Sequence, residues 1–153
     1  MKLYIETSVP NILFHDDAPD LQRMTKEFFE WGRVCADEFF TSAVAEVEIA
    51  RAPEGLRDKL LNALRSLHPE LLDITAESRS LAQLYLAEGI LPAQFSDDAL
   101  HVAVAVCHRM DAVVSWNMNH LANMRRVERI NRLNLRQGMP AIRIHTPAEV
   151  MES

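Results

Sequence analysis

The sequence predicts an α/β domain in which helices cover both faces of a central parallel sheet. Short apolar strand candidates alternate with helical segments along the chain, and this alternation is typical of a parallel sheet. Hydrophobic residues make up 48% of the sequence and charged residues 25%, which is ordinary for a globular protein. A chain of 153 residues is long enough for one domain with a real core. We therefore expect a single domain over residues 1–153.

The first half of the chain is predicted to supply the earlier strands. Lys2 to Ile5 is expected to form a short buried strand that ends in Glu6-Thr7-Ser8. Ser42 suits the N-cap of a helix that carries Glu48 and ends before Pro53. The other elements predicted here are a helix over 25–34, a strand over 39–41, an amphipathic helix over 55–67 and a strand over 71–74.

The second half is predicted to continue the same alternation. A helix over 76–88 and a loop over 89–92 lead to an apolar helix that starts with Asp97 and Asp98. A short apolar strand from Ala112 follows and ends in Ser115-Trp116-Asn117. The remaining elements predicted are a long helix over 121–135 closed by Gly138, a strand over 141–144, and a helix start at Thr146 with a capping-box Glu149.

Bulk composition excludes some classes of protein. The formal charge is −6, so the chain does not coat nucleic acid by charge alone. A nuclease stays compatible, because a carboxylate-built site adds negative charge that its divalent ions offset. No apolar run approaches a membrane span and no leader opens the chain, so we expect a cytoplasmic protein with no membrane partner. Cys35 and Cys107 have no metal-type spacing and are expected to be reduced core thiols.

The charge is distributed unevenly along the chain. Residues 125–136 carry five arginines against one glutamate, a balance of +4 that leaves −10 for the remainder. Their spacing places four of them on one face of the predicted helix, namely Arg125, Arg129, Arg132 and Arg136. A charge run is usually a solvated face. Against the acidic remainder, this arginine stripe is also a candidate contact for an RNA backbone or an acidic partner.

Three carboxylates are predicted to meet at one edge of the sheet. Glu6 ends the first strand, Glu48 lies on the helix after the second, and Asp98 opens the helix before the fourth. Ligands of open α/β sheets bind outside the carboxyl ends of the strands. Hard cations such as Mg²⁺ prefer oxygen ligands and can polarise a phosphoryl oxygen and activate water for in-line attack. The constellation therefore fits metal-assisted phosphodiester hydrolysis.

The two glutamates also have purely structural interpretations. Glu6 alone would be a solvated strand end, but the polar Thr7 and Ser8 beside it favour a functional role. Glu46 and Glu48 lie two positions apart on the predicted helix, so they point to different faces and only one is expected to serve the site. For either of these two alone, a solvated helix face is the better interpretation.

The later polar residues are weighed in the same way. Asp97 and Asp98 are typical helix-start residues that stabilise the macrodipole, but Asp98 shares a face with apolar residues and is expected to point inward more than Asp97. His101 is expected to be a hydrogen-bonded packing residue rather than a ligand. Asn117 is interpreted equally well as a turn residue or as a group that binds water or phosphate. Trp116 is expected to pack rather than to stack on a base.

At these residues the chain resembles the PIN-domain family, which includes the VapC-like ribonuclease toxins of type II toxin–antitoxin modules. The resemblance implies a three-layer α/β/α sandwich with a central parallel sheet, and RNA cleavage that depends on Mg²⁺ or Mn²⁺. The matching stretches follow the family's order over nearly the whole chain: Tyr4-Ile5-Glu6-Thr7-Ser8-Val9-Pro10, Thr41-Ser42 leading to Glu48-Ile49, Asp97-Asp98-Ala99-Leu100-His101-Val102-Ala103, and Ser115-Trp116-Asn117 leading to His120-Leu121.

The resemblance implies a role for each matching residue. It places the family's first, second and third carboxylates on Glu6, Glu48 and Asp98. Thr7 or Ser8 matches the hydroxyl that follows the first carboxylate. The position at which many members carry a fourth acid is Asn117.

Two departures from the family pattern are visible. The family usually has aspartate at its first position, and Glu6 is one methylene longer, which matters because Mg²⁺ demands near-ideal octahedral geometry. The fourth acid is absent unless Asp97 substitutes for it. These departures support a second hypothesis, in which the chain is a catalytically weak PIN module that binds or regulates.

The first hypothesis is a metal-dependent endoribonuclease that is the toxin of a toxin–antitoxin pair. Its Mg²⁺ or Mn²⁺ would be held by Glu6, Glu48 and Asp98, with Asp97 as an additional or capping group. Asn117 and Thr7 would orient water or phosphate, and the arginine stripe would draw in the RNA. Besides the RNA substrate, the candidate partners are an antitoxin protein and a second copy of the chain, although no self-complementary patch is evident.

A phosphotransfer or phosphatase domain is the third hypothesis. It also gathers carboxylates around Mg²⁺ at the ends of parallel strands, but it needs an aspartyl nucleophile after the first strand and usually a lysine near the phosphoryl group. Here the first position is Glu6, and the lysines of the chain, Lys2, Lys26 and Lys59, do not lie at a late strand end. This hypothesis therefore ranks below the other two.

Overall fold

A five-stranded parallel sheet forms the centre of the computed structural model, which describes residues 1–119 and 121–153. The strand order is β3-β2-β1-β4-β5. The strands are β1 (Lys2–Ile5), β2 (Glu38–Ser42), β3 (Glu70–Leu72), β4 (Ala112–Val114) and β5 (Arg143–His145). In the register, Tyr4 of β1 lies opposite both Phe40 of β2 and Val113 of β4. The predicted α/β class with a central parallel sheet is confirmed.

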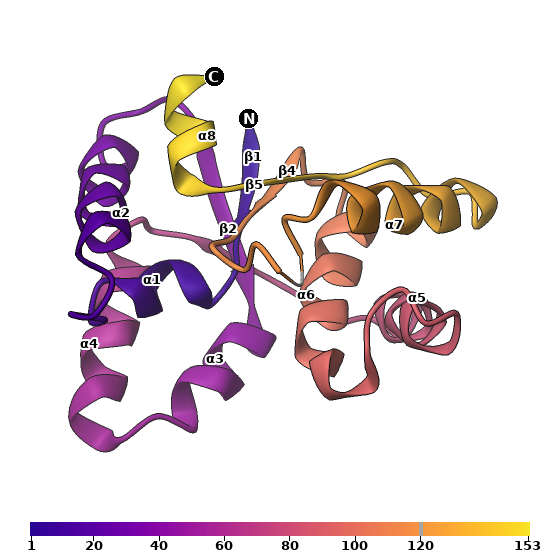
Figure 1. The fold of residues 1–153 in the computed structure, drawn as a ribbon, viewed down its shortest axis with the longest axis horizontal. Helices are drawn as coiled ribbons and strands as arrows, with labels where there is room; N and C mark the ends of the chain where they lie inside the picture. The colour runs from indigo at the N-terminus through magenta and orange to yellow at the C-terminus, as the bar shows by residue number, and fades with distance from the viewer. Residues whose placement is uncertain (120) are drawn as a thin grey trace.

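Helices cover both faces of the sheet and complete a three-layer α/β/α arrangement (Figure 1). One layer contains α1 (Ser8–Ile12), α2 (Pro19–Gly32), α3 (Ala43–Ala50), α4 (Glu54–Arg65) and α8 (Pro147–Glu152). The other contains α5 (Ala76–Ala87), α6 (Ser96–Cys107) and α7 (Met124–Arg136). A short 3₁₀ turn, η1 (Ala93–Phe95), leads into α6.

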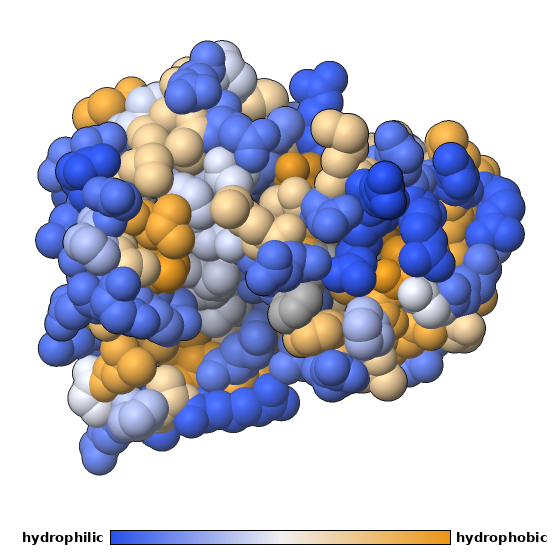
Figure 2. Space-filling model, in the orientation of Figure 1, coloured by the Kyte–Doolittle hydropathy of each residue, from blue (hydrophilic) through white to orange (hydrophobic). Residues whose placement is uncertain are grey.

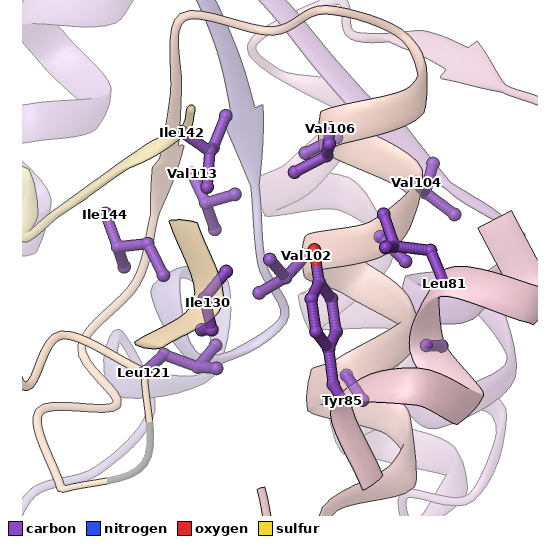
Figure 3. Close-up of a cluster of buried hydrophobic side chains, with 14 of the residues drawn as sticks. Leu81, Tyr85, Val102, Val104, Val106, Val113, Leu121, Ile130, Ile142 and Ile144 are labelled. Carbon is purple, nitrogen blue, oxygen red and sulfur yellow. The ribbon is translucent and has the colours of Figure 1, made fainter. Parts of the chain in front are cut away.

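The core is divided into two clusters, because successive residues of a strand point to opposite faces of a sheet. Leu3 and Ile5 of β1 pack in the cluster under α2 and α4. Tyr4, between them, packs in the cluster under α5, α6 and α7. Figure 3 shows part of this second cluster, in which Val102 and Tyr85 approach each other from α6 and α5.

Helix α6 is buried between the sheet and α5, and this burial decides where its polar residues lie. Each residue from Val102 to Val106 is at most 1% exposed, as expected for a helix that is apolar on all sides. Asp98 and His101 lie in the N-terminal half of the same helix and are buried too. The inward orientation predicted for Asp98 is therefore confirmed.

Several predicted helix boundaries are also confirmed. The side chain of Ser42 caps α3 by accepting a hydrogen bond from the Val44 amide. Thr146 and Glu149 form the reciprocal capping box of α8. The long helix α7 begins at Met124, later than predicted, because Asn123 accepts hydrogen bonds from the first turn and acts as its N-cap.

Two local features differ from the prediction. Helix α1 (Ser8–Ile12) was not predicted, and its Pro10 lies in the first turn, where proline is tolerated. The cysteines were expected in the core, but Cys35 lies in a bend after α2. Both cysteines are free and half-buried. Among the described residues, no helix is long and apolar enough to cross a membrane.

Candidate active site

The candidate site lies where the strand order changes direction. The chain proceeds from β1 outward to β2 and β3, and then returns to the other side of β1 to form β4 and β5. The carboxyl ends of β1 and β4 are therefore adjacent, and ligands of open α/β sheets bind at such a switch point. Glu6 directly follows β1, and Ser115 directly follows β4. The β1–β4 ladder continues past the strands, because the Glu6 amide donates to the Val114 carbonyl over 3.1 Å.

Glu6 is buried and one of its oxygens is held by three donors. Only 4% of the residue is exposed. Its Oε2 accepts hydrogen bonds from the Ser8 amide at 2.9 Å, from the Ser8 hydroxyl, and from the Ser115 hydroxyl at 3.0 Å. Within the part of the chain that the structure describes, the other oxygen, Oε1, accepts no hydrogen bond. We call Glu6, Ser8 and Ser115 the serine clamp.

Glu48 is held in a similar way from the opposite side of β1. Its Oε1 accepts a hydrogen bond from the Thr7 hydroxyl at 2.7 Å and another from Nε2 of His101. Burial raises the pKa of Glu48, but the hydrogen bond and charge of His101 and the hydrogen bond from Thr7 outweigh it and lower the pKa below its ordinary value. Glu48 is therefore ionised at neutral pH. Thr7, predicted to orient water or phosphate, orients Glu48 here.

Asp98 is the carboxylate whose ionisation is most strongly perturbed. It is 8% exposed and accepts a hydrogen bond from Nδ2 of Asn117 at 3.0 Å. Burial and the negative charges of Glu6 and Glu48 raise its pKa to about 7, against the opposing effects of His101 and Asn117. A carboxylate pKa raised by burial and like charge is common at functional sites. The two predicted glutamates thus both lie within electrostatic range of Asp98.

The neighbouring acids, Asp97 and Glu46, have surroundings of their own. Asp97 is half-buried and forms a 2.8 Å ion pair with Arg51 from the end of α3. Glu46 is exposed, and it lines a different hollow, beside Leu61 and His68. The expectation that only one of Glu46 and Glu48 serves the site is consistent with this placement. Asp97 thus takes part in a surface ion pair, and its expected role as a fourth acid stays a prediction.

The polar and aromatic residues after β4 have contacts that define their structural roles. Asn117 is a turn residue, because its backbone carbonyl accepts from the Leu121 and Ala122 amides. Its side-chain amide donates to Asp98, and its expected binding of water or phosphate stays a prediction. Trp116 is half-buried and donates to Thr25 on α2 over 2.8 Å, so it packs as predicted. His120, the last matching position of the resemblance, lies outside the described residues.

The arginine stripe extends away from the candidate site. All four arginines are exposed on α7, which begins after the loop that follows Asn117 and runs outward from the middle of the molecule (Figure 1). Arg136, at its outer end, pairs with Glu88 at 2.6 Å. Figure 2 shows that the surface over α7 is mainly hydrophilic, with hydrophobic side chains between the polar ones.

The carboxylates of the site are the kind of ligand that a hard divalent cation prefers, but they do not all converge on one point. Among the described residues, no group of three or more His, Cys, Asp or Glu side chains is arranged to hold one ion. Mg²⁺ is usually held by only one or two carboxylates together with water and substrate phosphate. Glu6 and Asp98 meet this smaller requirement, since both are buried oxygen donors and the charge of Glu6 helps to raise the pKa of Asp98.

Ser8 and Ser115 are the functional candidates that the sequence alone did not identify as a pair. Both lie in stretches that match the PIN-domain family, but the resemblance implies a role only for Ser8. The available signal was positional, because Ser115 follows β4 as Glu6 follows β1 and the two strands are neighbours. Strand order cannot be derived from local residue patterns, so this contact became visible only in the fold.

The comparisons with known proteins support the fold. No family model matches the chain, and no curated protein does so. The chain is similar to a solved structure, the crystal structure of VapBC2 from Rickettsia felis bound to a DNA fragment from their promoter. The TM-score is 0.56 at 11% sequence identity, and the match covers 95% of this chain and 98% of the other. At this identity the likeness concerns the arrangement of the chain alone.

Proposed function

We propose that this protein is a PIN-domain endoribonuclease that hydrolyses RNA phosphodiester bonds with the help of Mg²⁺ or Mn²⁺. The observation that carries the proposal is the pair of buried carboxylates, Glu6 and Asp98, at the switch point of a parallel sheet. Glu48 lies within electrostatic range of Asp98. The fold likeness to VapBC2 from Rickettsia felis supports the proposal, because VapC-like ribonucleases belong to the family that the sequence resembles.

The residues of the site have distinct tasks in this proposal. Glu6 and Asp98 hold the cation, with Glu48 as the third carboxylate. When bound, the cation supplies positive charge that polarises a phosphoryl oxygen and makes water more acidic. The serine clamp fixes Glu6, Asn117 fixes Asp98, and Thr7 fixes Glu48. Arg125 and Arg129, exposed on the inner half of the stripe, attract the RNA backbone.

A cleavage assay with two neighbouring aspartates tests the proposal. Asp98→Asn removes a buried carboxylate of the site, so RNA cleavage in Mg²⁺ or Mn²⁺ should fall by at least about 100-fold. The matched control is Asp97→Asn, which changes the adjacent residue of the same helix turn, where the side chain pairs with Arg51. The control should stay within about threefold of the wild type. Unaltered cleavage by Asp98→Asn would overturn the assignment.

A catalytically weak module is the second candidate function. The serine clamp favours it, because Ser8 and Ser115 engage a glutamate in a position where the family usually has aspartate. Glu6→Asp separates the two candidates. Cleavage that appears only in Glu6→Asp would show a degenerate natural site. Robust cleavage by the wild type would rule this candidate out.

We also propose that the chain is the toxin of a toxin–antitoxin pair. The support is the fold likeness to VapBC2, which was crystallised with promoter DNA. A neighbouring reading frame that encodes a small protein with a DNA-binding half should accompany this chain. Co-expression of the two should yield a stable complex on size-exclusion chromatography with light scattering. The same measurement on the chain alone determines whether it forms a homodimer.

A further inference from the structure

His101 is a fully buried histidine with hydrogen bonds at both ring nitrogens. It is 0% exposed. Nε2 bonds to Glu48, and Nδ1 lies 2.6 Å from the hydroxyl of Tyr4. Because the ionised Glu48 carboxylate can only accept, Nε2 carries the hydrogen of that bond. The proposed function assigns this histidine no task, although it touches one of the three acids.

A second layer of contacts holds the histidine itself. The Tyr4 hydroxyl lies 2.7 Å from Oγ of Ser42, the residue that caps α3. The Tyr4 ring also packs edge-on against the imidazole, with the ring centroids 5.6 Å apart. Tyr4 belongs to the central strand and is 0% exposed. The chain of contacts therefore runs from the middle of the core to the candidate site.

These contacts join three elements that separately supply the acids. Tyr4 precedes Glu6 by two residues on β1, Ser42 begins the helix that carries Glu48, and His101 lies one turn after Asp98 on α6. A shift of α3 against α6 would break the bond between His101 and Glu48. The side chain of Glu48 is 23% exposed, and an unrestrained glutamate of this kind samples several rotamers. The histidine restricts it to one.

Only one oxygen of Glu48 is used by these hydrogen bonds, so the other is available to bind a ligand. Thr7 and His101 both bond to Oε1. Within the described residues, Oε2 accepts no hydrogen bond. Glu6 shows the same division between its two oxygens, with Oε2 clamped by serines. Groups behind metal-binding side chains fix their orientation in this manner, and their loss typically costs 10–100-fold in metal affinity.

We propose that His101, supported by Tyr4 and Ser42, is a positioning residue that fixes the Glu48 carboxylate for the divalent cation. The inference rests on the proposed function, because that function supplies the cation that Glu48 would bind. It assigns His101 no contact with RNA and no proton transfer. The core contacts of Tyr4 and His101 thereby help to define the shape of the metal site.

Mn²⁺ titration followed by calorimetry or electron paramagnetic resonance tests this inference without an activity assay. His101→Gln should weaken Mn²⁺ binding by about 10–100-fold, and Tyr4→Phe should weaken it by about threefold or more. In a Glu48→Gln background, His101→Gln should cause no further loss, because the carboxylate that it positions is gone. Circular dichroism and thermal unfolding verify that each variant is folded.

Tyr85→Phe is the matched control. Tyr85 is also fully buried, and its hydroxyl bonds to Asn134 on α7, away from the acids. This variant loses one buried hydrogen bond, as Tyr4→Phe does, but should bind Mn²⁺ within about twofold of the wild type. Equal losses in both tyrosine variants would show a general effect of stability and overturn the inference.

Failure of this inference can be distinguished from failure of the proposed function. If Asp98→Asn abolishes Mn²⁺ binding while His101→Gln leaves it unchanged, the metal site stands and the positioning role is wrong. Additive losses from His101→Gln and Glu48→Gln would also overturn the positioning role. If the wild type binds no Mn²⁺, the proposed function fails and this inference fails with it.

Discussion

Glu6 and Glu48 are each anchored through a single carboxylate oxygen. The hydroxyls and amide of the serine clamp hold Glu6, and Thr7 with His101 hold Glu48. Hydrogen bonds to ionised groups are the stronger ones in proteins. They offset part of the cost of burying negative charge at the end of β1. Apart from Ser8, the neighbours that orient these acids lie far away in the sequence.

Ser115→Ala should destabilise the protein through Glu6. It removes a donor to the Glu6 carboxylate and also the acceptor of the Asn117 amide. A buried partner left unsatisfied costs about 1–3 kcal/mol. Urea unfolding should show this loss in the free energy of unfolding, whereas Ser80→Ala, on the exposed face of α5, should change it by less than about 0.5 kcal/mol. A Ser115→Ala variant as stable as Ser80→Ala would contradict the clamp.

Asp98 should make the metal-free protein less stable as pH rises through the weakly acidic range. Its pKa is raised to about 7 in the folded state from an ordinary value of 3.8. Between these pH values the folded state binds more protons than the unfolded state, so stability falls as pH rises from about 4 to about 7. The loss from this group should amount to about 1–4 kcal/mol.

Urea unfolding in EDTA over that pH range measures the effect. Asp98→Asn should flatten the decline and be more stable than the wild type at pH 8. Asp97→Asn should retain the decline, because Asp97 is half-exposed and paired with Arg51. An identical decline in wild type and Asp98→Asn would show that another group causes it.

At the scale of the element, packing and capping explain most of what the sequence predicted. The alternation at Leu3, Tyr4 and Ile5 assigns β1 to both core clusters, and polar residues such as Ser42 and Thr146 cap helices by local hydrogen bonds. Strand alternation and helix capping each involve only a few neighbouring residues, so the sequence alone predicts them. The pairing of His101 with Glu48 joins positions 53 apart, and no local pattern encodes it. Such contacts depend on strand order and helix packing.

Two glycines illustrate how the fold decides the effect of one substitution. A Cβ at Gly32, in the last turn of α2, would lie 2.6 Å from Leu67 and 3.2 Å from Phe39. A Cβ at Gly55, in the first turn of α4, would meet nothing within 4 Å. Gly55→Ala should therefore stabilise the protein by about 0.4–1 kcal/mol. Gly32→Ala should instead destabilise it by about 1 kcal/mol or more through overpacking.

Thermal unfolding of the two glycine variants measures this difference. The comparison is matched because both positions are helical and neither has a positive φ. Stabilisation of similar size in both variants would mean that α2 moves away from β2 at little cost. That result would contradict the close packing of α2 on Phe39 and Leu67.

At the scale of the whole molecule, charge separates the face of α7 from the rest. The balance of +4 over residues 125–136 stands against −10 elsewhere. The stripe from Arg125 to Arg136 extends over about 16 Å of helix, starting from the end that follows the candidate site. The fold thus places a long cationic surface to one side of an acidic site. The arginines of this surface lie at increasing distances from that site along the helix.

RNA binding should depend on these arginines in order of their position. Each lost phosphate contact reduces the salt slope of binding by about 1 and weakens binding almost uniformly across sequences. Arg125→Gln and Arg129→Gln should show this reduction. Arg136→Gln should show little, because Arg136 lies at the outer end and pairs with Glu88. The measurement is fluorescence anisotropy of a labelled RNA with the Asp98→Asn variant over a range of salt. Equal slopes in all three variants and the parent would mean that RNA approaches the acids from another face, and that the arginines of α7 serve a different partner.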